Sequence, residues 1–183
     1  HILIMPSLPM AREFPMSYKL GETQEEIHID SAEENRSAAA SLIQQACISI
    51  DIFSQDLEAE LYNNMEIEQS IFNLAIRHPN TRVRILVQDS RIAVSSGHRL
   101  IKLAQNLTSS VFINTPSGEF KTERGAFLVA DQIGILYRVS ASNRNYKAII
   151  NYMSPQRAGK LTDFFNEAWE HSTPDIQTRR IYV

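Results

Sequence analysis

The sequence contains a single cysteine, Cys47, among its 183 residues. One thiol cannot form an internal disulfide, which excludes the disulfide-stapled class of small secreted domains and is typical of a reducing compartment. We therefore expect a cytoplasmic protein. Cys47 lies between Ala46 and Ile48, just before an apolar segment, and we expect it to be buried as a small hydrophobic residue.

Signals for metals and cofactors are missing as well. No pair of cysteines or histidines has the spacing of a zinc site. The six glycines are scattered, so they form neither a dinucleotide-binding loop nor a P-loop. No serine stands in a G-x-S-x-G motif. We expect neither a metal nor a cofactor.

Positive charge is not in excess, and long apolar runs are absent. The formal net charge is -3, from 18 basic and 21 acidic side chains. A domain-wide electrostatic grip on nucleic acid needs the opposite balance, so the composition speaks against that partner. No apolar run approaches the roughly 20 residues that span a bilayer. The apolar start at His1 lacks the features of a signal peptide and has the character of a cloning remnant.

The chain does contain a regular alternation of helix-like and strand-like segments. Ser31 followed by Glu34 forms a capping box, which predicts a helix to about Ala46. Apolar periodicity predicts further helices over 66–78, after Gly97 through 107, and from Pro155 onward. Predicted strands cover 48–53, 83–87, 111–113, 126–130, 133–139 and 146–152. We interpret residues 1–25 as an N-terminal arm, 26–172 as one domain and 173–183 as a C-terminal tail.

Strands that alternate with helices favour an α/β fold. We expect a mixed, mainly parallel sheet with helices on both faces and antiparallel strands added late in the chain. Such sheets usually bind ligands beyond the carboxyl ends of their strands.

The order of these segments resembles one half of the phospholipase D superfamily. The resemblance runs from about Ser31 to Ser172. It rests on the alanine-rich helix leading into 47–54, on 83–89, on 127–131, on Ser140-Ala141-Ser142-Asn143 and on the closing 164–169. It implies a phospholipase D-like fold. Because such enzymes pair two halves, it also implies a two-fold homodimer with the late strands near Asp131 and 140–143 close to the interface. The chain is similar, too, to an uncharacterised bacterial family of degenerate domains of this kind.

Enzymes of that superfamily carry a His-x-Lys-x-x-x-x-Asp motif, whose histidine attacks phosphorus and whose lysine neutralises phosphate charge. If Asp131 takes the aspartate position, Arg124 stands at the histidine position and Ala126 at the lysine position. Arginine is too basic to act as a nucleophile, and alanine supplies no charge. The resemblance therefore implies a catalytically silent regulatory module that binds an anionic small molecule or a protein partner.

Candidate ligand-binding residues gather first around His98. His98 and Arg99 stand where a helix is expected to begin, and free N–H groups at helix starts attract anions. Arg91 lies on the same predicted loop and would add charge, although a capping or surface histidine is the alternative. Asp89 ends a predicted strand at the carboxyl edge, where it is either functional or a turn residue.

The late strands supply three further candidates. Arg124 and Arg138 are candidates to hold an anion by their planar guanidinium groups, with solvated surface arginines as the alternative. Asp131 either belongs to the site or shapes the turn before Ile133. A second function hypothesis is a phosphodiesterase- or nuclease-type hydrolase with a displaced site, in which His98 is nucleophile or base and needs partners within hydrogen-bond reach. A nucleic-acid adaptor is the third.

Overall fold

One sheet organises the part of the chain that the computed structural model describes, which is residue 14 and residues 17–178. Its strands are β1 (Ile27–Ile29), β2 (Ser49–Ser54), β3 (Arg82–Val87), β4 (Val111–Thr115), β5 (Ala126–Ala130), β6 (Gly134–Arg138), β7 (Ala148–Asn151) and β8 (Thr173–Pro174). They lie side by side in the order β1-β7-β6-β5-β2-β3-β4-β8. The segment expected as a C-terminal tail thus contributes β8, which pairs with β4.

Six α-helices surround this sheet within the described residues: α1 (Ala32–Gln45), α2 (Ala59–Tyr62), α3 (Met65–Arg77), α4 (Arg91–Ser95), α5 (Arg99–Asn106) and α6 (Pro155–Glu170). Short 3-10 turns form η1 (Gly118–Lys121), η2 (Ser142–Arg144) and η3 (Ile176–Thr178). Ser31 caps α1, because its hydroxyl accepts the N–H of Glu34 at 3.1 Å. None of these helices combines the length and the apolar character needed to cross a membrane.

Parallel pairing is confined to β2 with β3 and β3 with β4, and the remaining neighbours in the sheet are antiparallel. The predicted α/β fold, with a mixed sheet and helices on both faces, is confirmed, but the expectation of a mainly parallel sheet is wrong. The connections from β2 to β3 and from β3 to β4 contain helices and join neighbouring strands, as parallel pairing requires. A tight turn joins β5 to β6 and therefore makes them antiparallel.

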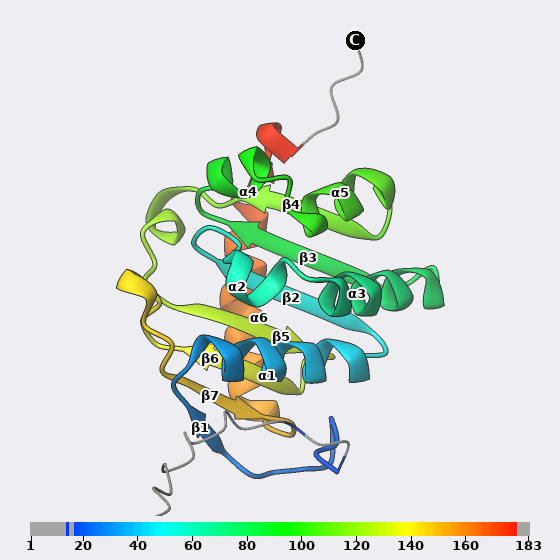
Figure 1. Ribbon diagram of the computed structural model, residues 1–183, viewed down its shortest axis with the longest axis vertical. Coiled ribbons are helices and arrows are strands. Elements are labelled where there is room, and N and C mark those ends of the chain that lie inside the picture. The colour runs from blue at the N-terminus through cyan, green and yellow to red at the C-terminus, as the bar shows by residue number, and fades with distance from the viewer. Residues whose placement is uncertain (1–13, 15–16, 179–183) are drawn as a thin grey trace, which may run out of the picture.

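Helices cover both faces of the sheet and create two apolar cores. Helices α1, α2 and α3 lie in front of the sheet in Figure 1, and α6 crosses behind it. Strand β5 serves both cores because successive side chains point to opposite faces. Leu128 and Ala130 pack with the α1 side, whereas Phe127 and Val129 pack with Phe165 of α6. Continuous apolar stretches such as β5 are therefore buried on both faces.

Asp131 ties the turn after β5 to the beginning of β2. It has a φ of 52°, and its carboxylate accepts hydrogen bonds from the backbone N–H groups of Cys47, Ile48 and Ser49 at 2.8 to 3.1 Å. Its own N–H donates to the Ser49 carbonyl at 2.9 Å. One side chain thus satisfies three donors where the chain passes from α1 into the sheet.

Cys47 is exposed, so the expectation that it is buried is wrong. It lies outside the sheet, in the surface connection after α1 that Asp131 holds. Its Sγ accepts a hydrogen bond from Nη1 of Arg77 at 3.0 Å.

Removing the Asp131 carboxylate should destabilise the fold. Asp131→Ala leaves three backbone donors without their partner, and we expect the free energy of unfolding to fall by about 3 kcal/mol in urea denaturation. Asp131→Asn tolerates the left-handed backbone and keeps one acceptor, so it should lose less. The control is Asp163→Ala on the exposed face of α6, which should stay within about 0.5 kcal/mol of the unmodified chain. Equal losses at Asp131 and Asp163 would contradict this anchoring role.

Candidate functional site

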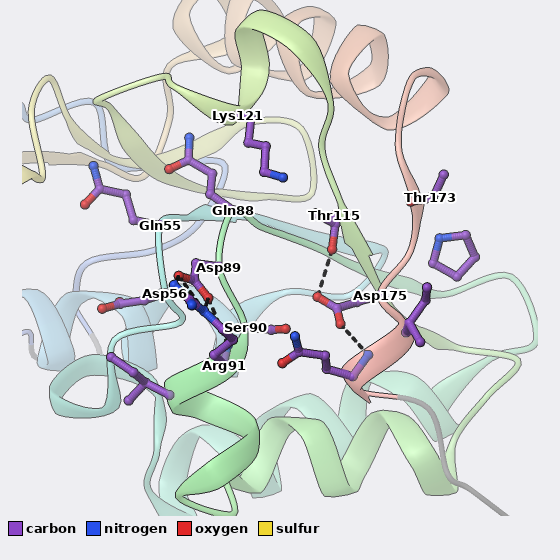
Figure 2. A pocket seen from close by; sticks show the side chains of 14 residues that line it. Gln55, Asp56, Gln88, Asp89, Ser90, Arg91, Thr115, Lys121, Thr173 and Asp175 are labelled. Carbon is purple, nitrogen blue, oxygen red and sulfur yellow. Dashed lines mark hydrogen bonds and ion pairs between the residues drawn. The ribbon is translucent and has the colours of Figure 1, made fainter.

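A hollow lies beyond the carboxyl ends of the parallel strands β2, β3 and β4. Its volume is about 730 Å³, within the range of small-molecule sites. The residues that follow β2 and β3 line it together with Thr115, Lys121 and the segment around Asp175 (Figure 2). The three parallel strands end at the same edge of the sheet, and the loops that follow them run in different directions. The space between these loops is the usual place for a ligand in an open α/β sheet.

Asp89 and Arg91, two of the candidates read from the sequence, line this hollow and contact one another. Nε and Nη2 of Arg91 donate to the Asp89 carboxylate at 3.0 and 2.7 Å, and the Arg91 backbone N–H adds a third hydrogen bond at 3.1 Å. These hydrogen bonds lower the pKa of Asp89 to about 2. The pair is exposed, so the ion pair contributes little free energy and the arginine can exchange Asp89 for a ligand.

Two further polar groups point into the hollow in Figure 2, the hydroxyl of Ser90 and the ammonium of Lys121. Ser90 is only 6% exposed, yet its hydroxyl does not cap α4 and makes no hydrogen bond among the described residues. Opposite them, the hydroxyl of Thr115 donates to the Asp175 carboxylate at 2.8 Å. The hollow therefore offers one ammonium, one guanidinium and one hydroxyl to an anion.

His98 does not line the hollow. It is 1% exposed and caps α5, where Nδ1 accepts the N–H of Leu100 at 3.1 Å. Nε2 lies 2.9 Å from the Leu57 carbonyl and therefore carries the proton that it donates there. Burial lowers the pKa of His98 to about 4, against a smaller upward effect of the Leu57 carbonyl. Neighbouring Arg99 faces Glu68, with 3.6 Å between Nη1 and Oε2.

The late-strand candidates lie apart from one another. Asp131 is at the end of the sheet opposite the hollow, because it contacts the beginning of β2 and not its carboxyl end. Arg124 is exposed, and its carbonyl accepts the N–H of Ala141 at 2.8 Å. Arg138 is buried on the α1 and α2 side, where Nη1 contacts Oε1 of Glu58 at 2.5 Å.

Sequence reasoning missed Ser90, Lys121 and Asp175. Ser90 follows Asp89 directly, so the strand end that singled out Asp89 also marks its neighbour. Lys121 belongs to η1 after β4, and no local pattern connects it to the ends of β2 and β3. Asp175 falls in the segment that was interpreted as a tail. Within residues 14 and 17–178, no cluster of histidine, cysteine and acidic side chains is arranged to hold a metal ion.

Comparison with protein families gives one match. Residues 31–181 match a family model described as Domain of unknown function (DUF7931). A search of curated proteins gives no match to this sequence.

Solved structures of several other proteins share the fold. An archaeal chromatin protein, TrmBL2, whose structure is described as showing a novel mode of DNA binding, superposes with a TM-score of 0.62 at 14% identity. That match covers 84% of this chain, which spans 55% of the length of TrmBL2. The phospholipase D family member Nuc from Salmonella typhimurium (14% identity) and NucT from Helicobacter pylori (13%) each give a TM-score of 0.57, covering 82% of this chain and 99% of theirs. The fold is thus phospholipase D-like.

His98 should make the stability of the protein depend on pH. Its pKa is about 4 when folded, whereas an unfolded histidine titrates near 6.5. Between these values the unfolded state binds more protons, so the free energy of unfolding falls as the pH drops from 6.5 toward 4. The expected loss from this residue is about 2 kcal/mol at pH 5. Urea denaturation at pH 7.5, 6 and 5 measures it.

The matched variants are His98→Asn and His28→Asn. Asparagine keeps a capping side chain at position 98 but does not titrate, so the loss at pH 5 should shrink by about 2 kcal/mol. His28 is largely exposed, and its replacement should leave the pH profile of the unmodified chain in place. An unchanged acid loss in His98→Asn would show that other groups cause it.

Proposed function

We propose that this chain, which belongs to the family described as Domain of unknown function (DUF7931), is a catalytically silent phospholipase D-like module that binds an anionic ligand. The observation that carries the proposal is the chemistry at the motif positions at the start of strand β5 and just before it. Arg124 and Ala126 stand where the resemblance places the nucleophilic histidine and the lysine. Neither side chain attacks phosphorus, and the fold by itself confers no activity.

The surroundings of Ala126 support catalytic silence. Ala126 is paired with Arg138 across β5 and β6, so the arginine extends from the same face of the sheet. The carboxylate of Glu58 meets that arginine. The space left beside Ala126, Glu58 and Arg138 is about 10 Å³, the lower limit for one water molecule. A substrate phosphate does not fit there while this ion pair is in place.

Anion binding is assigned instead to the hollow at the carboxyl ends of β2, β3 and β4. Lys121 and Arg91 supply positive charge, and the Ser90 hydroxyl supplies a donor that the rest of the described chain leaves unused. Asp89 and Asp175 border the same space. They favour a ligand that carries hydroxyl or amino groups next to its anionic group, because these groups would donate to the carboxylates.

Nucleic acid is not proposed as the partner. Likeness to TrmBL2 at 14% identity concerns the fold. The formal net charge of -3 opposes a phosphate-driven grip on DNA or RNA. The two-fold homodimer expected from the resemblance stays a prediction.

Catalytic silence predicts that the purified chain does not hydrolyse bis-p-nitrophenyl phosphate. Release of p-nitrophenolate, followed by absorbance, should not exceed the rate without protein. Because the ion pair of Glu58 and Arg138 closes the space beside Ala126, the double variant Arg124→His/Ala126→Lys should stay equally inactive. Turnover by the unmodified chain that a single substitution abolishes would refute the proposal.

Binding in the hollow predicts that unhydrolysed bis-p-nitrophenyl phosphate raises the midpoint of thermal unfolding in a saturable way. Lys121→Gln removes the ammonium and should weaken this apparent affinity by about tenfold, the effect of one charged hydrogen bond. Lys160→Gln on the exposed side of α6 is the control and should bind as the unmodified chain does. Equal affinities for the two lysine variants would show that the ligand binds outside the hollow.

A further inference from the structure

Arg138 and Glu58 form an ion pair in the interior, where their side chains are 3% and 5% exposed. The acceptors of the Arg138 hydrogen bonds are all groups of the protein itself. Nη1 donates to Glu58, while Nε and Nη2 donate to the Asn145 carbonyl at 2.9 and 2.5 Å. The ring of Tyr146 stacks on the guanidinium at 4.9 Å. A guanidinium this deeply buried needs an anion beside it, because water does not solvate it.

The carboxylate that meets this need fits it incompletely. Oε1 of Glu58 contacts Arg138, but Oε2 is buried and accepts no hydrogen bond, and Nη1 of Arg144 is 3.7 Å away from it. Asp51 and Arg84 form the comparison within the same chain. There both carboxylate oxygens accept, from Nε at 2.9 Å and from Nη2 at 3.0 Å. The geometry around Glu58 is thus that of an anion site with one donor position unfilled.

Unfavourable backbone conformations surround the same ion pair. Five residues other than glycine have positive φ among the described residues, and two of them, Asp131 and Gln132, form the turn between β5 and β6. The other three flank the pair. Leu57, with φ of 59°, immediately precedes Glu58, while Asn143 and Arg144, with φ of 56° and 57°, form η2. Strained conformations persist where surrounding contacts enforce them. Leu57 is held by the Ser54 hydroxyl and by His98, each at 2.9 Å, whereas Arg144 faces Oε2 of Glu58. The ion pair therefore lies between two segments whose backbones are fixed in unfavourable conformations.

We propose that Arg138 is the centre of a buried oxyanion-binding site that the carboxylate of Glu58 occupies as an internal ligand. The external ligand of this site is a small carboxylate or phosphate, which would replace Glu58 at Nη1 of Arg138 and also accept from Arg144. The site is separate from the anion site proposed in the hollow. The two are neighbours, because Asp56 lines the hollow two residues before Glu58.

The experiment empties the site and refills it with a free anion. Glu58→Ala removes the internal carboxylate and should lower the midpoint of thermal unfolding. Sodium formate and inorganic phosphate are then titrated separately, with chloride holding the ionic strength constant. Each anion that the site accepts should raise the midpoint in a saturable way, by about 5 °C or more at a 100-fold excess over its Kd. The anion with the lower Kd identifies the ligand as a carboxylate or a phosphate.

Three controls assign the effect to Arg138. Glu58→Ala/Arg138→Met should lose the response, and Glu58→Ala/Lys121→Gln should keep it, which separates this site from the hollow. Asp51→Ala empties the other buried ion pair. Its arginine, Arg84, is 22% exposed, stacks on Phe165 at 4.8 Å and also donates to Asn166, so it should not need a replacement anion.

Several outcomes overturn the proposal. They are a folded Glu58→Ala that responds to neither anion, an equal response in Asp51→Ala, and a response that survives Arg138→Met. If Glu58→Ala does not fold, Glu58→Asp retracts the carboxylate by one methylene, and the same titrations and the matching Arg138→Met double variant decide the question. Unchanged affinity of Lys121→Gln for bis-p-nitrophenyl phosphate would instead remove the hollow from the proposed function and leave this site unaffected.

Discussion

Strand β2 is the junction on which the rest of the structure depends. It pairs in parallel with β3 on one edge and antiparallel with β5 on the other, so the parallel and antiparallel parts of the sheet meet along its length. Asp131 fixes the beginning of β2 through three backbone N–H groups, and the hollow opens beyond its end. A register shift of β2 by one residue would move its apolar side chains to the wrong core and would also change the shape of the hollow.

The two buried ion pairs illustrate different uses of the same chemistry. Asp51 and Arg84 lie on the α6 side, where the guanidinium is held by two parallel hydrogen bonds and by the rings of Phe165 and Trp169. Such bidentate pairs are specific in geometry and keep their partner. The pair of Glu58 and Arg138 has a single short contact and an unfilled acceptor. Burial of two charges with imperfect pairing adds little stability, which is a reason to look for a role in binding.

Much of the fold could be predicted from the sequence, because periodic apolar patterns and a helix cap are local signals. The helix that Ser31 begins, the apolar strands and the late hairpin all follow from such signals. The direction of pairing is not local. Strand β5 pairs antiparallel with β2, with Ala130 opposite Ile50, and no local pattern indicates a pairing between segments so far apart in the sequence. Strands β1 and β8 have three and two residues, too few for a period to show.

The residues of the candidate site also divide into those marked by local sequence signals and those that depend on contacts distant in sequence. Asp89 and Arg91 were predictable as neighbours of the hollow because a strand end and its loop are adjacent in sequence. For His98 and Arg138, burial determines whether the side chain is free to bind a ligand. His98 has the sequence position of an anion-binding residue, but Leu57 and Leu100 engage both of its ring nitrogens. Arg138 has the residue type of an anion receptor, but Glu58, 80 positions away, determines whether it is available.

The proposed anion site beside β5 and β6 and the proposed lack of catalysis have a common physical basis in the pairing of Ala126 with Arg138. Ala126 and Arg138 are cross-strand partners on one face, so the arginine supplies beside Ala126 the positive charge that alanine lacks. A guanidinium attracts an oxyanion as strongly as an ammonium does, but it donates no proton, since its pKa is far above neutral. Arg124 is exposed and stands where the resemblance places the nucleophile, so the proposed function keeps the attraction for an anion and omits the attack on phosphorus. In this proposal, recognition of an anion depends on the guanidinium of Arg138, whereas cleavage of its ester would need a nucleophile that Arg124 does not supply.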